Sequence, residues 1–156
     1  MTPALSIPCM AHERSGARPV CAVGTPCFPA RARVLGVARN LVIKVTAGKD
    51  EPERCNQAFT VASTAVASGV PVSLWLTGEA AWFALPGRAD DFSLPHAAPL
   101  ADLLASVLAF GTVTICGQCA ARRDITPQDV IEGVRIAGAA TFVAEVVADD
   151  VQALVY

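Results

Sequence analysis

The stretch NLVIKVTAGKDEPERCNQAFTVASTAVASGVPVSLWLT, residues 40–77, decides the fold of this chain because its hydrophobic period changes twice. A β-branched apolar run at 40–47 predicts a strand. Apolar residues then recur at helical spacing, which predicts a helix from about Glu51 to a stop at Gly69. A second apolar run at 71–77 predicts another strand. Strand, helix and strand in this order are typical of an α/β protein.

The predicted helix has a start signal and an apolar face. Asp50, with Glu53 three residues later, predicts a capping box, and Pro52 falls in the first turn, where its missing N–H costs nothing. Cys55 lies on the apolar face of the helix. We therefore interpret Cys55 as a small core residue rather than as a reactive thiol.

The rest of the chain continues the alternation of helix and strand. The further predicted elements are a short helix at 78–85, a long loop at 86–99, a helix at 100–110, a strand at 111–116, a helix from Pro127 to Gly133 capped by Thr126, a strand at 134–137, a helix at 138–150 and a strand at 151–156. The pattern predicts an α/β sandwich around a mainly parallel sheet of about five strands.

The N-terminal part of the chain differs from this regular domain of residues 39–156. Residues 1–38 hold five of the eleven prolines, three cysteines and no sustained apolar period, which predicts a poorly ordered extension. The extension contains four arginines and one acid, whereas residues 39–156 contain eight Lys or Arg and thirteen Asp or Glu. An acidic domain does not favour nucleic acid as a partner.

The hydropathy and the cysteines of the sequence indicate the cellular compartment in which the protein is expected. No window of eighteen residues is free of polar and charged side chains, and the start lacks the regions of a secretory signal. We expect no membrane association and a cytoplasmic protein, in which the six cysteines are mostly reduced. Zinc needs about four ligands, which one C-x-x-C with Cys55 or His96 does not supply. We expect no metal and no cofactor, and interpret His96 as a surface loop residue.

Small and polar residues follow three of the predicted strands. In parallel sheets, ligands bind outside the carboxyl ends of the strands, so these residues converge on one candidate site. They are Gly48, Lys49 and Asp50 after the first strand, Thr77, Gly78 and Glu79 after the second, and Cys116, Gly117, Gln118 and Cys119 after the third.

The C-x-x-C pair is the strongest candidate for chemistry. A thiol reacts as its thiolate, and a helix N-terminus or a nearby cation lowers its pKa toward neutrality. Arg122 and Arg123 follow Cys119 closely enough to supply that charge if the segment coils. The alternative is that Cys116 and Cys119 are two small core residues at a strand end. Lys49 either steers an anionic sulfur species or partner tail, or simply solvates its loop.

Three segments together resemble a known family. VTAGKDEPERCNQAFTVASTAVASGVPVSLWLTGEA, PLADLLASVLAFGTVTICGQCAARRDI and VIEGVRIAGAATFVAEVV resemble the DsrE/DsrF-like family, which is associated with sulfur relay. The resemblance covers about residues 39–156. It implies a three-layer α/β/α sandwich around a parallel five-stranded sheet, assembled into dimers, trimers or hexamers. It also implies that a cysteine carries sulfur as a persulfide between a donor and an acceptor protein.

The family motif is carried over onto particular residues. Cys116 and Cys119 match the cysteine-rich strand end, and Arg123 matches the arginine that follows it. Asp124 stands where family members often have glycine, and Asp tolerates left-handed backbone better than most residues.

These observations lead to three hypotheses for function. In the first, Cys116 or Cys119 accepts sulfane sulfur, the other cysteine resolves the persulfide, and Arg122, Arg123 and Lys49 stabilise the anion. In the second, the chain is a non-catalytic oligomeric binding or scaffold protein, and in the third it is a thiol-disulfide switch. Large apolar residues either form a subunit interface or fill the core under the long loop; they are Trp75, Trp82, Phe83 and Phe92.

Overall fold

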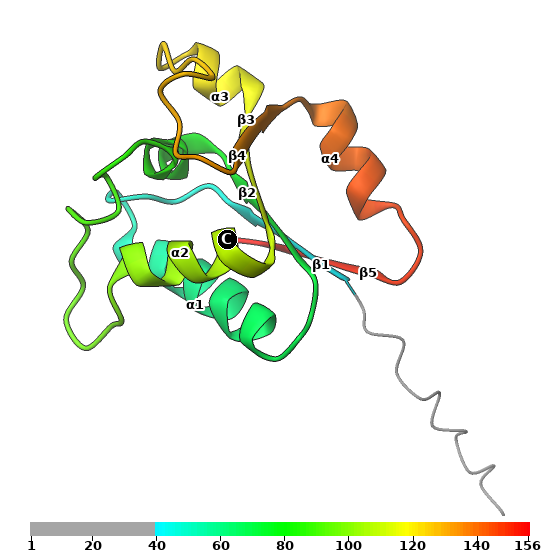
Figure 1. The fold of residues 1–156 in the computed structure, drawn as a ribbon, viewed down its shortest axis with the longest axis horizontal. Coiled ribbons are helices and arrows are strands. Elements are labelled where there is room, and N and C mark those ends of the chain that lie inside the picture. Colours follow the sequence, from blue (N-terminus) through cyan, green and yellow to red (C-terminus); the bar gives the residue numbers. More distant parts are fainter. Residues whose placement is uncertain (1–39) are drawn as a thin grey trace, which may run out of the picture. The chain divides into compact units, whose positions relative to one another are not determined.

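The structure, a computed structural model, describes residues 40–156 and contains a five-stranded parallel sheet (Figure 1). The strand order is β4-β3-β2-β1-β5. The strands are β1 (Asn40–Val45), β2 (Val72–Leu76), β3 (Thr112–Cys116), β4 (Val134–Ala137) and β5 (Val151–Val155). The predicted N-terminal extension, residues 1–38, lies outside the described residues.

Helices cover both faces of this sheet. They are α1 (Pro52–Ala67), the 3-10 helix η1 (Gly78–Ala84), α2 (Leu100–Phe110), α3 (Gly117–Ala121) and α4 (Ala139–Val146). Helices α1 and α2 lie together on one face, α4 lies on the other, and η1 and α3 follow the carboxyl ends of β2 and β3 (Figure 1). The predicted three-layer α/β/α sandwich with a parallel five-stranded sheet is therefore confirmed.

The parallel register sorts the strand residues by face. Side chains alternate along a strand, so a row of register partners points to the same side of the sheet. One row runs from Lys44 on β1 through Trp75 and Thr114 to Arg135 on β4, toward α4. The residues on either side of Lys44, Trp75 and Thr114 along their strands point the other way, toward α1 and α2. They are fully buried and apolar, namely Ile43, Val45, Leu74, Leu76, Val113 and Ile115.

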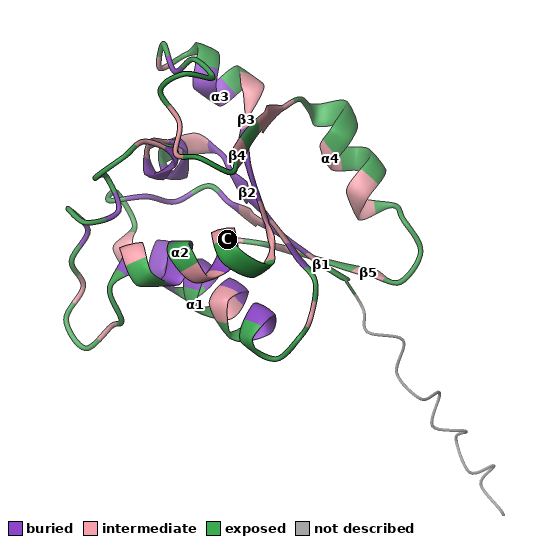
Figure 2. Cartoon of the chain, viewed as in Figure 1, coloured by how far each residue is buried: buried purple, intermediate pink, exposed green. Residues whose placement is uncertain are grey.

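Burial differs between the helices as well as between the faces (Figure 2). Helix α1 buries seven residues, including Cys55 and Phe59 at 0% exposure, which confirms Cys55 as a core residue. Helix α4 buries none. The large apolar residues mostly fill the core of the chain, because Trp75, Phe83 and Phe92 are all buried. These three residues therefore do not indicate a subunit interface.

Two local predictions were wrong. Residues 127–133 form turns rather than a helix, and the Thr126 hydroxyl and backbone N–H both donate to Asp129 Oδ2 at 2.6 and 2.8 Å. The capping box does not form either. Asp50 instead accepts a hydrogen bond from the Gly48 N–H at 2.6 Å, and α1 begins at Pro52 without a side-chain cap. In both segments, a local side-chain hydrogen bond stabilises a turn at the position where the sequence predicts the start of a helix.

Candidate functional site

The two cysteines of the C-x-x-C pair have different environments. Cys116 is the last residue of β3 and half-buried, whereas Cys119 lies in α3 and is buried at 8% exposure. Burial opposes ionisation of Cys116, but hydrogen bonds from the Cys119 N–H, the Cys119 thiol and the Gln118 N–H outweigh it. The charge of Lys44 acts in the same direction. Together these groups hold the pKa of Cys116 below its usual value of about 9.0.

Helix α3 explains this environment. It starts immediately after Cys116, so its first N–H groups have no helical carbonyl partner, and those of Gln118 and Cys119 contribute to the lowered pKa of the thiol. The sequence predicts that Arg122 and Arg123 supply a cation to the pair, but neither is among the groups that lower the pKa of Cys116, where the cation is Lys44. The stronger donors, however, are the backbone N–H groups of Gln118 and Cys119 themselves.

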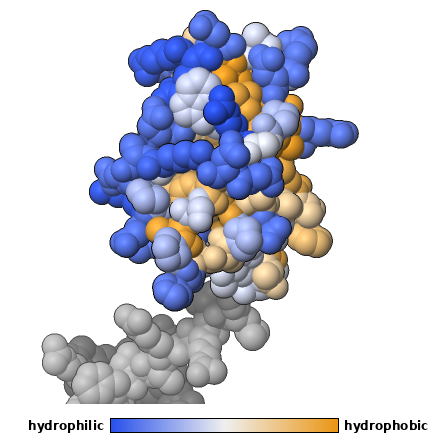
Figure 3. All heavy atoms as spheres, turned by 90° about the vertical axis from the view of Figure 1, so that its left-hand side faces the viewer, coloured by the Kyte–Doolittle hydropathy of each residue, from blue (hydrophilic) through white to orange (hydrophobic). Residues whose placement is uncertain are grey.

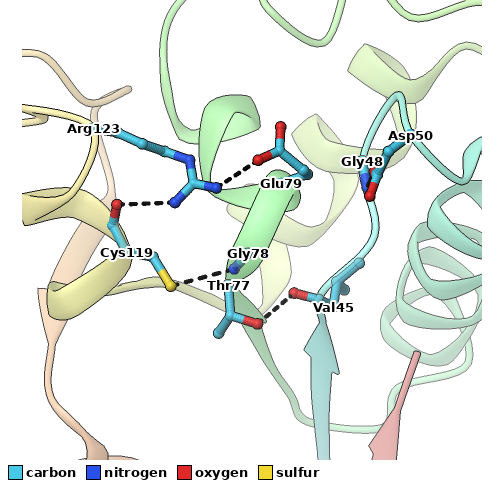
Figure 4. A network of polar contacts seen from close by, with 8 residues as sticks. All are labelled: Val45, Gly48, Asp50, Thr77, Gly78, Glu79, Cys119 and Arg123. Atoms are coloured by element: carbon cyan, nitrogen blue, oxygen red, sulfur yellow. Dashed lines mark hydrogen bonds and ion pairs between the residues drawn. The ribbon is translucent and has the colours of Figure 1, made fainter.

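Cys119 is held against the start of η1 (Figure 4). Its Sγ accepts a hydrogen bond from the Gly78 N–H at 3.2 Å. Gly78 has φ +52°, and a Cβ there would lie 2.6 Å from the Thr46 carbonyl oxygen, so only glycine presents the N–H in this way. The preceding Thr77 donates its hydroxyl to the Val45 carbonyl at 2.8 Å. The strand end of β2 is thereby tied both to β1 and to the buried cysteine.

Arg123 links α3 to η1 (Figure 4). Its guanidinium donates to the Cys119 carbonyl at 3.3 Å and to Glu79 Oε1 at 2.6 Å. The guanidinium also stands over Trp82, 5.6 Å from the ring centroid. Asp124 follows with φ +53°, so the tight turn expected after Arg123 does form. Arg123 therefore positions the helix that carries Cys119, rather than contacting a sulfur atom directly.

The remaining predicted site residues divide into two groups. Gly48 is buried and lies so close to Glu79 that a Cβ would come within 2.9 Å of it, which brings the first two strand ends together. Lys49 is exposed and lines a small pocket beside Glu79. Arg122 is exposed and forms no ion pair within residues 40–156. The structure thus brings Thr77, Gly78 and Arg123 to Cys119, with Lys49 farther along the same edge.

Two residues that contribute to the site, Lys44 and Trp82, were not predicted there, and Glu79 was predicted only as one of the residues that follow the second strand. Lys44 lies on the same sheet face as Cys116, Glu79 binds Arg123, and Trp82 stacks with it. The sequence does contain a signal for Lys44, because a lysine in the middle of an apolar strand is unusual unless its charge is paired. The contacts of Glu79 and Trp82 with Arg123 left no signal in the sequence, because Arg123 lies about forty residues away from both.

Other residues of the described part do not extend this site. Burial, and secondarily the charge of Asp50, raises the pKa of Cys55 to about 12. His96 is exposed in its loop, as expected. Within residues 40–156, no three His, Cys, Asp or Glu side chains lie close enough together to hold a metal ion. None of the helices in this range has the length and apolar composition to cross a membrane.

The fold and the paired thiols define a class of protein: a parallel α/β sandwich with cysteines at the carboxyl edge of its sheet. The DsrE/DsrF-like family matches residues 39–150, so the chain belongs to that family. The crystal structure of the YchN protein from E. coli has the same fold, with a TM-score of 0.64 and 19% sequence identity. The match covers 76% of this chain and 99% of that one.

A curated protein from Methanocaldococcus jannaschii is also similar to part of this chain. The uncharacterized protein MJ0760 of Methanocaldococcus jannaschii is 31% identical over 103 residues, which make up 65% of this chain. This chain spans only 38% of the length of that relative. The family is generally associated with sulfur relay, and the C-x-x-C pair at the end of β3 fits that association.

Proposed function

We propose that this chain carries sulfane sulfur as a persulfide on Cys116. The observation that carries the proposal is the environment of that thiol at the end of β3. Cys116 is partly accessible, and the first N–H groups of α3 together with Lys44 favour its thiolate. Cys119 is buried against Gly78 and is less able to meet a donor. Cys116 is therefore the nucleophile of the pair, and Cys119 is its neighbour and resolving thiol.

The transfer step is an exchange at sulfur. The Cys116 thiolate attacks the outer sulfur of a donor persulfide, R–S–SH, and forms a new S–S bond. The S–S bond of the donor breaks, and R–S⁻ leaves with the electron pair. The product is Cys116–S–SH, with no net oxidation or reduction. An acceptor thiolate takes the outer sulfur away by the same exchange, which leaves the Cys116 thiolate as before.

A second candidate function is a thiol-disulfide switch. The Cys119 side chain is among the groups that lower the pKa of Cys116, so the two thiols are neighbours. An external two-electron oxidant would join them and release two protons. This candidate uses the same residues but predicts a different mass change.

Intact-mass spectrometry separates the two candidates. The protein is incubated without reductant with a sulfane-sulfur donor, and any added mass is mapped. A carrier gains about 32 Da on Cys116, which dithiothreitol removes. A switch loses about 2 Da instead and shows a bond from Cys116 to Cys119.

Three serine variants make the assignment specific. Cys116→Ser is expected to abolish loading, whereas Cys119→Ser and the control Cys55→Ser retain it. Loading that persists in Cys116→Ser would show that Cys116 is not the carrier. No mass change in any of these proteins would count against both candidates and favour a binding or scaffold protein.

The proposal extends to partners and setting. We place the protein in the cytoplasm as a homo-oligomer, a dimer, trimer or hexamer, that exchanges sulfur with donor and acceptor proteins. Exposed valines support self-association: Val143 on α4 and Val147 at its C-cap are 53% and 72% exposed, and Val155 on the edge strand β5 is 67% exposed. Sedimentation as a monomer at all concentrations tested would refute the oligomer.

A further inference from the structure

A small pocket lies beside the cysteine site, at the edge where the strands end. It has a volume of about 190 Å³ and is lined by Lys49, Glu79, Trp82, Phe83 and Arg88. Figure 3 looks at this side of the molecule, where hydrophilic residues surround apolar patches. The pocket combines both kinds of residue, because two aromatic rings and three charged side chains share its wall.

The charge of the pocket favours an anion. Lys49 and Arg88 are exposed, and neither forms an ion pair within residues 40–156. The carboxylate of Glu79, the acidic group of the pocket, is already bound to Arg123 at 2.6 Å. Two cations are therefore left to bind a ligand carboxylate, and arginine also presents a planar pair of donors for it.

The lining residues and the volume of the pocket limit the kind of ligand that it can bind. Trp82 is half-buried and carries the Arg88 guanidinium 5.5 Å from its ring centroid, while Phe83 is 2% exposed. Such a wall accepts a short apolar stem beside the anionic group. The volume is below the roughly 300–1,000 Å³ that drug-sized ligands occupy. A molecule of about ten non-hydrogen atoms fits the pocket, whereas a nucleotide does not.

The pocket and the cysteine site both border the start of η1. Glu79 lines the pocket, and the adjacent Gly78 donates its N–H to Cys119 Sγ at 3.2 Å. Successive Cα atoms are only about 4 Å apart, so a stem that leaves the pocket toward Gly78 approaches the C-x-x-C pair. Arg123 contacts both regions, with one bond to Glu79 and one to the Cys119 carbonyl.

We propose that this pocket binds the carboxylate end of a low-molecular-weight thiol, whose persulfide can load Cys116 in place of a donor protein. The inference rests on the proposed persulfide function for its purpose, but the binding itself does not require reactive cysteines. Lys49 and Arg88 hold the carboxylate, and Trp82 holds the stem. The thiol end then points along η1 toward the C-x-x-C pair.

Binding is tested on the full chain with both thiols removed. The variant Cys116→Ser/Cys119→Ser is titrated with N-acetyl-S-methylcysteine, an unreactive carboxylate with a short thioether stem, and NMR follows the Trp82 indole N–H. For a ligand of this size we expect a dissociation constant of about 0.1–10 mM. The methyl ester of the same compound lacks the charge and should bind about tenfold more weakly or not at all.

Variants and a competing anion make the result specific. Lys49→Gln with Arg88→Gln is expected to weaken binding about tenfold, whereas Arg54→Gln, which removes an exposed arginine on α1 outside the pocket, changes it less than about twofold. Retained dispersion of the NMR spectrum shows that the variants fold. Absence of any Trp82 shift, or equal binding of acid, ester and sulfate, would overturn the proposal.

The result of the binding experiment can be distinguished from the result of the sulfur-loading experiment. If Cys116 never loads sulfur but the probe binds at Trp82, the persulfide carrier is wrong and the pocket stands. If Cys116 loads sulfur but the probe does not bind, the pocket assignment is wrong and the carrier stands.

Discussion

The two faces of the sheet are built on different principles. Toward α1 and α2, the strands present fully buried aliphatic side chains, and α1 adds Phe59, whose ring meets that of Phe83 edge-on at 5.9 Å. Toward α4, the same strands present Lys44, Trp75, Thr114 and Arg135. The first face is a hydrophobic core, whereas the second is held by polar contacts.

Helix α4 depends on two of its residues. Phe142 packs edge-on against Trp75 at 5.3 Å and lies beneath the Lys44 ammonium. Glu145 accepts hydrogen bonds from the Ser73 hydroxyl at 2.7 Å and the Trp75 indole at 2.8 Å, and forms an ion pair with Arg135. Because Cys116 and Lys44 share this face, the polar side of the sheet also supplies a charge that lowers the pKa of Cys116. One face is a closely packed apolar core, and the other holds α4 through Phe142 and Glu145 and affects the ionisation of Cys116.

The largest expected effect is on the apolar face. Phe59→Ala should lower the free energy of unfolding by about 3–5 kcal/mol, because it empties a fully buried site. Phe142→Ala on the polar face should cost only about 1–2 kcal/mol, because that ring is partly exposed. Urea unfolding followed by circular dichroism measures both. Equal losses would mean that the two faces contribute alike and would refute the comparison.

Alkylation compares a thiol from each face. With iodoacetamide at pH 7.5, native Cys116 should react at least about 100-fold faster than Cys55, which is 0% exposed and has its pKa raised to about 12. Peptide mass mapping over time gives both rates. In denaturant the two rates should converge, since the difference comes from the fold. Similar rates in the native protein would contradict the assigned environments.

Substitution of Glu145 tests how much its hydrogen bonds contribute to holding α4 on the sheet. Glu145→Gln should lower the free energy of unfolding by about 1–2 kcal/mol at pH 7, because it weakens charged hydrogen bonds to Ser73, Trp75 and Arg135. Burial opposes ionisation of Glu145, but these bonds outweigh it and hold its pKa below the usual value of about 4.5. The stabilisation is therefore complete above about pH 4.5 and is lost as pH falls through the lower folded-state pKa.

The pH dependence provides the control for Glu145. Urea unfolding at several pH values should show a loss of stability below pH 4.5 that is smaller in the Gln variant than in the parent. Identical pH profiles of the two proteins would show that this carboxylate does not anchor the helix.

Substitution of Lys44 should have the smallest effect of the four predictions, and this effect should be specific to the reactivity of Cys116. Lys44→Gln removes a cation that lowers the pKa of Cys116, so its alkylation at pH 7 should slow by about two- to fivefold. The rate at high pH, where the thiol is ionised in both proteins, should be unchanged. The pH–rate profile separates this from a structural effect, and Arg54→Gln serves as the charge control. An unaltered profile would remove Lys44 from the site.

Much of the fold was predictable from local pattern. The strand and helix alternation, the burial of Cys55 and the position of the C-x-x-C pair all follow from periodicity or from residues close in sequence. The failures were also local, because Asp50 and Asp129 both had a nearby turn N–H to bind. The sequence pattern does not distinguish such a turn from a helix cap, since both use the same side chains.

By itself, the sequence determined that the chain is an α/β protein with two thiols at a strand end. Only the tertiary structure decided which thiol is accessible, that Lys44 acts on it, and that Glu79 and Trp82 hold Arg123 in place. The physical reason is distance along the chain. Periodicity and turns are set by residues within a few positions of one another, whereas burial, ion pairs and pKa depend on segments that meet only when the sheet forms.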